Sequence, residues 1–99
     1  MRLTDHQRTT IHHTAEEMFG AAARVYLFGS RIDDAQRGGD IDLLVEVDHT
    51  VENRPSAAAR FAAKLQRQLG DRRIDVLIID PVTKLQQVHT IARETGVAL

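Results

Sequence analysis

The chain contains no cysteine, and aromatic residues make up only 4% of its 99 residues. The lack of cysteine excludes a disulfide scaffold, a thiolate nucleophile and a cysteine-ligated zinc site. No apolar run approaches the roughly 18 residues of a membrane span. The first twenty residues carry three acids and no continuous apolar stretch, so we expect no secretory signal. With a net charge of -1, the chain also gives no indication of nucleic-acid binding.

The composition is typical of a small soluble protein. Hydrophobic residues make up 42% of the sequence and charged residues 27%. A chain of this length buries roughly two-thirds of its unfolded surface, which is enough for one modest core. We therefore expect a single cytoplasmic domain over residues 1–99.

The acidic residues are concentrated in the middle of the chain. Residues 32–52 contain seven acids and one base, Arg37, whereas the rest contains seven acids and twelve bases. An acidic segment suits divalent cations and a basic remainder suits anions. Two solvated faces of opposite charge explain the distribution equally well.

Local patterns predict helices and strands in the order α-β-β-α-β-α, which gives an α/β (α+β) fold with helices packed on a small sheet. A capping box of Thr4 and Gln7 indicates a helix that begins near Asp5. The third strand is almost continuously apolar, so we expect it to be central in the sheet. The other expected elements are strands at 24–28, 40–47 and 74–79, a helix at 56–69 that ends at Gly70, and a last helix from Pro81 to Gly96.

Three aspartates are predicted to lie in strands, where an ionised carboxylate is costly to bury. In the strand 40–47, the alternation places Asp40 and Asp42 on one face with Leu44 and Glu46. Two carboxylates this close repel unless a cation lies between them, and Mg²⁺ prefers such oxygen ligands. Asp75 reaches the same place if its strand is the neighbour. The opposite face of the strand carries Ile41, Leu43, Val45 and Val47.

A purely structural interpretation of these aspartates stays open. The D-x-D pattern is short and common, and Asp40 follows two glycines, where a turn residue is ordinary. Asp75 has Arg72 and Arg73 nearby as possible ion-pair partners. Asp42 fits this interpretation least, because Ile and Leu flank it inside the strand.

A second candidate feature is the turn Gly29-Ser30, which directly follows the predicted strand 24–28. Backbone N–H groups and a serine hydroxyl in such a turn make an anion site, and glycine allows close approach of a ligand. Arg31 and Arg37 can add bidentate contacts to phosphate. Taken alone, Gly-Ser-Arg is also typical of a plain turn. Its place ten residues before Asp40 makes it informative.

Taken together, LFGSR at 27–31, GGDIDLLVEV at 38–47 and RIDVLII at 73–79 resemble the DNA polymerase β-type nucleotidyltransferase superfamily. The similarity is greatest to the minimal nucleotidyltransferases, short proteins paired with a helical HEPN-type partner, often as toxin–antitoxin modules. The resemblance implies a small mixed sheet with packed helices. One departure is Gly39, where many members have Ser before the first Asp; it leaves the expected ligands intact.

The resemblance also implies a role for each motif residue. Asp40, Asp42 and Asp75 match the three carboxylates that bind two Mg²⁺ ions, with Asp75 also acting as base beside the acceptor hydroxyl. Gly29 and Ser30 match the turn that binds the nucleotide, and Arg31 fits a phosphate contact. The implied reaction is two-metal nucleotidyl transfer from ATP.

In the antitoxin members, AMP is transferred to a tyrosine of the HEPN-type toxin, so we expect a hetero-oligomer. Only a segment long enough for one helix follows Asp75, which also favours an acceptor held by another chain. One alternative is a non-catalytic antitoxin that neutralises its partner by occlusion. Another is transfer to a small molecule or an RNA 3′ end, against which the lack of a basic, aromatic-rich surface argues.

Other polar clusters are better explained as solvated surface. His12 and His13 are neighbours that point about 100° apart on a helix, which does not suit shared metal ligation. A line of basic residues on the second helix is likewise better explained as a solvated face than as a binding site. It consists of Arg60, Lys64 and Arg67.

Overall fold

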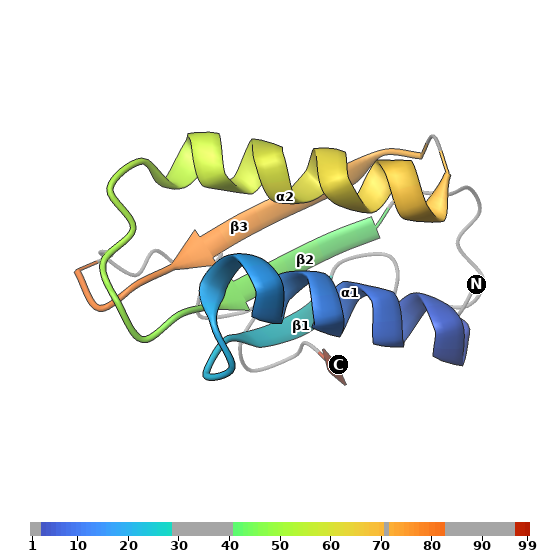
Figure 1. Ribbon diagram of the computed structural model, residues 1–99, viewed down its shortest axis with the longest axis horizontal. Coiled ribbons are helices and arrows are strands. Elements are labelled where there is room, and N and C mark those ends of the chain that lie inside the picture. Colours follow the sequence, from blue (N-terminus) through green and yellow to red (C-terminus); the bar gives the residue numbers. More distant parts are fainter. Residues whose placement is uncertain (1–2, 29–40, 71, 83–96) are drawn as a thin grey trace.

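A computed structural model of the chain describes residues 3–28, 41–70, 72–82 and 97–99. Four strands form one mixed sheet in the order β3-β2-β1-β4, with β2 parallel to β3, and with β1 antiparallel to β2 and β4. Both helices pack on the same face of this sheet (Figure 1). The predicted fold class is confirmed. The elements are α1 (Asp5–Phe19), β1 (Arg24–Phe28), β2 (Ile41–Glu46), α2 (Arg54–Leu69), β3 (Ile74–Ile79) and β4 (Val97–Ala98).

The helices begin and end at capping residues. At α1, the Gln7 N–H donates to Thr4 Oγ1 at 3.1 Å and the Thr4 N–H donates to Gln7 Oε1 at 2.8 Å, which confirms the capping box. Gly20 and Gly70 end the two helices at φ 95° and 101°, a region that disfavours side chains with a Cβ. Neither described helix has the length and apolar character needed to span a bilayer.

The start of α2 differs from the prediction. The helix begins at Arg54, two residues before the expected Ser56, because the Asn53 side chain accepts a hydrogen bond from the Ser56 N–H at 3.0 Å. Pro55 lies in the first turn, where its missing N–H costs no helical hydrogen bond.

The main core lies between the sheet and the helices. The predicted inner face of β2 is confirmed, because Ile41, Leu43 and Val45 are all fully buried there. Phe61 of α2 is fully buried and meets Phe19 of α1 edge to face, with ring centroids 5.6 Å apart. The helices are thereby fixed to each other as well as to the sheet.

The prediction that the strand 74–79 is central was wrong. Among the described strands β3 lies at one end of the sheet, and β2 is its neighbour. The strand is apolar for another reason: each of its two faces packs against a cluster of apolar side chains. Ile78 joins the main core, whereas Leu77 and Ile79 pack with Leu44 and Tyr26 on the opposite face.

The last segment of the chain differs from the prediction. Of the helix predicted from Pro81 to Gly96, Pro81 and Val82 form a turn, and residues 83–96 lie outside the described residues. The short strand β4 was not predicted; it pairs with β1 through Tyr26↔Ala98 and Leu27↔Val97.

Candidate active site

Asp42 lies on the face of the sheet opposite α1 and α2. Its neighbours Ile41 and Leu43 are buried beneath the helices, and strand alternation turns Asp42 to the other side, where it is half-buried. The apolar cluster of Leu44, Ile79, Tyr26 and Leu77 lies farther along this same face. An apolar surface therefore borders the carboxylate on one side.

The structure brings Asp42 and Asp75 together. In the parallel pairing of β2 with β3, Asp42 is directly in register with Asp75. Residues in register on neighbouring strands project from the same face, with their backbones about 4.8 Å apart. Two of the three predicted carboxylates therefore share one place on the sheet, and their role as metal ligands remains a prediction.

An arginine accompanies the pair. Arg73 Nε lies 3.2 Å from Asp75 Oδ2, and the two side chains are 72% and 53% exposed. The ion pair considered at the sequence level for Asp75 is thus present, with Arg73 as the partner. Because both groups are largely in water, the pair is weak.

The carboxyl end of β1 lies beside Asp42. Phe28, the last residue of β1, is the register partner of Asp42 across the antiparallel pairing. Gly29 follows Phe28 directly in the sequence, and Asp40 directly precedes Ile41. Of the other predicted site residues, Gly29, Ser30, Arg31 and Asp40 lie outside the described residues.

The chain is similar to a known protein family. A protein-family model described as "Polymerase beta, Nucleotidyltransferase" matches residues 10–97, which is most of the chain. The chain belongs to this family. A search of the curated proteins finds no match.

The donor set of this nucleotidyltransferase domain fits a divalent ion. Domains of the family generally use a nucleoside triphosphate with Mg²⁺. Asp42 and Asp75 offer hard carboxylate oxygens from two rigid strands, which are the donors that Mg²⁺ prefers. Among the described residues, no group of three metal-ligating side chains occurs. The third predicted ligand, Asp40, lies outside the described residues.

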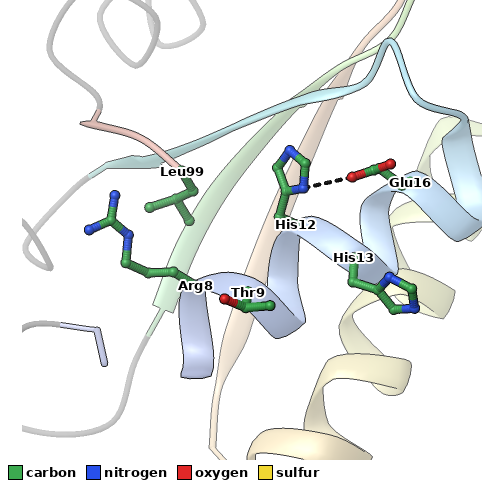
Figure 2. A pocket seen from close by; sticks show the side chains of 6 residues that line it. All are labelled: Arg8, Thr9, His12, His13, Glu16 and Leu99. Atoms are coloured by element: carbon green, nitrogen blue, oxygen red, sulfur yellow. Dashed lines mark ion pairs between the residues drawn. The ribbon is translucent and has the colours of Figure 1, made fainter. Parts of the chain in front are cut away.

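A shallow pocket elsewhere on the nucleotidyltransferase domain is lined by two histidines, His12 and His13. It lies between α1 and Leu99 at the C-terminus, and it is lined by Arg8, His12 and Glu16 among others (Figure 2). His12 Nδ1 lies 2.8 Å from Glu16 Oε1, one helical turn away. His13 and Glu17 form a longer pair at 3.8 Å. Both histidines are exposed, as expected for a solvated helix surface.

Sequence reasoning missed a buried carboxylate at the end of β3. The side chain of Asp80 is fully buried. It accepts hydrogen bonds from the Val51 N–H at 2.8 Å and from the Val82 N–H at 3.2 Å, and Arg54 Nη1 lies 3.4 Å away. Asp80 thereby ties the segment before α2 to the end of β3. Only the long-range contacts reveal this role, because its partners Val51 and Arg54 lie 29 and 26 residues earlier.

Proposed function

We propose that this nucleotidyltransferase domain transfers AMP from ATP to a hydroxyl group, with Mg²⁺ bound by Asp40, Asp42 and Asp75. The observation that carries the proposal is the register of Asp42 with Asp75 on one face of the sheet. It brings together two strand carboxylates that lie 33 positions apart in a chain of this family.

Each predicted residue has a defined task in this reaction. When bound, the divalent ions lower the pKa of the acceptor hydroxyl and stabilise the charge of the leaving pyrophosphate. Asp75 orients the acceptor hydroxyl and takes up its proton. The hydroxyl oxygen then forms a bond to the α-phosphorus as the bond to pyrophosphate breaks. Gly29, Ser30 and Arg31 bind the phosphates, so that the protein contributes mainly by positioning.

We further propose that the acceptor is a tyrosine of a HEPN-type helical partner, and that the chain acts as the antitoxin of that partner. Support comes from the motifs shared with the minimal nucleotidyltransferases, LFGSR and GGDIDLLVEV. The reactive face is formed by strands rather than enclosed by α1 and α2, which pack on the opposite side. Asp75 on that face is 53% exposed, so among the described residues it can meet an acceptor carried by another chain.

The test uses the full chain, the product of the neighbouring gene, Mg²⁺ and ATP labelled in its α-phosphate. Light scattering first measures whether the two proteins form a complex. We then expect the wild type to label the partner and Asp42→Asn to do so roughly 100-fold more slowly or worse, because it loses a metal ligand. Glu46→Gln is the matched control, since it neutralises an acid on the same strand and the same face.

Equal labelling by wild type and Asp42→Asn contradicts the catalytic proposal, as does no labelling by either protein. The alternative is neutralisation by occlusion, in which the carboxylates have no catalytic task. A variant that carries both Asp40→Asn and Asp42→Asn distinguishes the two. If it binds the partner and still neutralises it, occlusion is sufficient.

A further inference from the structure

Arg73 is the one positively charged side chain that the described residues place in an ion pair with a candidate metal ligand. It lies two residues before Asp75, so strand alternation brings both side chains to the same face. Its Nε is 3.2 Å from Asp75 Oδ2, and Asp75 is in register with Asp42. The guanidinium therefore lies beside Asp75, at the place where the two strand carboxylates come together.

The electrostatics of the two carboxylates explain this placement. Two like charges on adjacent strands repel, and a nearby cation relieves the repulsion. A divalent ion and a guanidinium both supply that charge, but they compete for the same carboxylate oxygens. Because Arg73 is 72% exposed, its pair with Asp75 is cheap to break.

We propose that Arg73 is a positioning residue of this site: it neutralises Asp75 until the divalent ion binds, and it then binds the phosphates of the incoming nucleotide. The inference rests on the proposed function, because it takes Asp75 as a metal ligand. A guanidinium suits both partners, since its planar donors match carboxylate and phosphate alike. The release of Arg73 thus couples ion binding to nucleotide binding.

If Arg73 acts in this way, its removal changes the affinity for the divalent ion and the affinity for the nucleotide in opposite directions. Without Arg73 the divalent ion has no competitor, so the chain alone binds it more tightly. With the ion already bound, the nucleotide loses a phosphate contact and binds more weakly. A general disturbance of the site lowers both affinities, so the opposite signs separate the proposed role from a structural one.

The experiment measures Mn²⁺ binding to the full chain by titration calorimetry, first without nucleotide. Arg73→Ala is expected to tighten Mn²⁺ binding about two- to fivefold, the range that corresponds to one exposed ion pair. Arg24→Ala is the matched control. Arg24 is also an exposed strand arginine on the same face, but it is in register with Glu46 at the far end of β2. The substitution Arg24→Ala therefore removes the same charge without affecting the ion pair of Asp75.

The second measurement titrates a non-hydrolysable ATP analogue at saturating Mn²⁺. Arg73→Ala is expected to weaken its binding about tenfold, the loss of a charge-assisted contact. Arg73→Lys keeps the charge without the planar fork. It is expected to restore the wild-type Mn²⁺ affinity and only part of the nucleotide affinity.

The outcomes distinguish this inference from the proposed function. If neither the wild type nor any arginine variant binds Mn²⁺, or if Asp42→Asn binds it as the wild type does, the metal site itself is wrong. If Mn²⁺ binding requires Asp42 but Arg73→Ala matches Arg24→Ala, the competition is refuted while the metal site stands. If Arg73→Ala tightens Mn²⁺ binding and leaves the nucleotide affinity unchanged, the transfer to phosphate is refuted.

Discussion

The buried carboxylate of Asp80 joins three parts of the chain through its hydrogen bonds with Val51, Val82 and Arg54. Replacing it by alanine leaves two backbone N–H groups without their acceptor and the Arg54 guanidinium without its counter-charge. We expect Asp80→Ala to lower the free energy of unfolding by about 2–4 kcal/mol, since a hydrogen bond to a charged group contributes about 1.5–3 kcal/mol. Urea unfolding followed by circular dichroism measures the change.

Asp48→Ala provides the control for this prediction. Asp48 is also an acid near the end of a strand, but it is 67% exposed and pairs only with the neighbouring His49 among the ion pairs of the described residues. Its loss is expected to change stability by less than about 0.5 kcal/mol. Equal urea midpoints for the two variants would contradict the structural role assigned to Asp80.

The contrast between Asp42 and Asp80 shows what the sequence can predict about single residues. Alternation within the strand 40–47 was enough to place Asp42 on the face opposite Ile41 and Leu43, because that pattern is local. The pairing of Asp42 with Asp75 depends on which strands are neighbours, so the sequence supported it only conditionally. The bonds of Asp80 span 26 to 29 residues and leave no local pattern.

At the scale of elements, the capping box at the start of α1 stabilises the whole helix. The side chains of Thr4 and Gln7 satisfy two N–H groups that have no partner within the helix. We expect Thr4→Ala to lower the free energy of unfolding by about 1 kcal/mol. Thr9→Ala makes the same substitution inside α1 at an exposed position, where alanine is the better helix former, and should stabilise slightly. Thermal unfolding compares the two; shifts of the same sign would refute the assignment.

The element boundaries show where local signals compete. Both β1 and β3 have the predicted limits, since β-branched and apolar runs ended by polar residues or glycine predict strands well. The helix α2 begins earlier than predicted because Asn53 caps it and Pro55 is tolerated in its first turn. Apolar content alone predicted a central position for β3, yet a strand at the end of the described sheet is equally apolar when both faces pack.

At the scale of the whole molecule, strand order determines the candidate site. The order α-β-β-α-β followed from local patterns, but the mixed sheet came only from the family resemblance, because periodicity does not reveal which strands pair. The connection through α2 makes β3 parallel to β2 and brings Asp75 level with Asp42. The connection through α2 therefore determines which strand lies beside β2 and in which direction, and the hydrogen bonds between β2 and β3 then hold the two carboxylates level.

Phe61 allows the contribution of the helix layer to be separated from that of the strand pairing. Its ring projects from α2 into the core and is fully buried. The ring centroids of Phe61 and Phe19 of α1 lie 5.6 Å apart, so Phe61 joins both helices to the sheet. Phe61→Ala is expected to cost about 3–5 kcal/mol, a large share of the about 5–15 kcal/mol that stabilises a domain of this size.

Urea unfolding measures this loss, and Val82→Ala is the control because Val82 is 63% exposed. At low temperature, where Phe61→Ala is still folded, we expect its Mn²⁺ affinity to match the wild type, because the hydrogen bonds between β2 and β3 hold the register of Asp42 with Asp75. A folded Phe61→Ala that no longer binds Mn²⁺ would show instead that the helix layer, and not the strand pairing, sets the geometry of the two carboxylates.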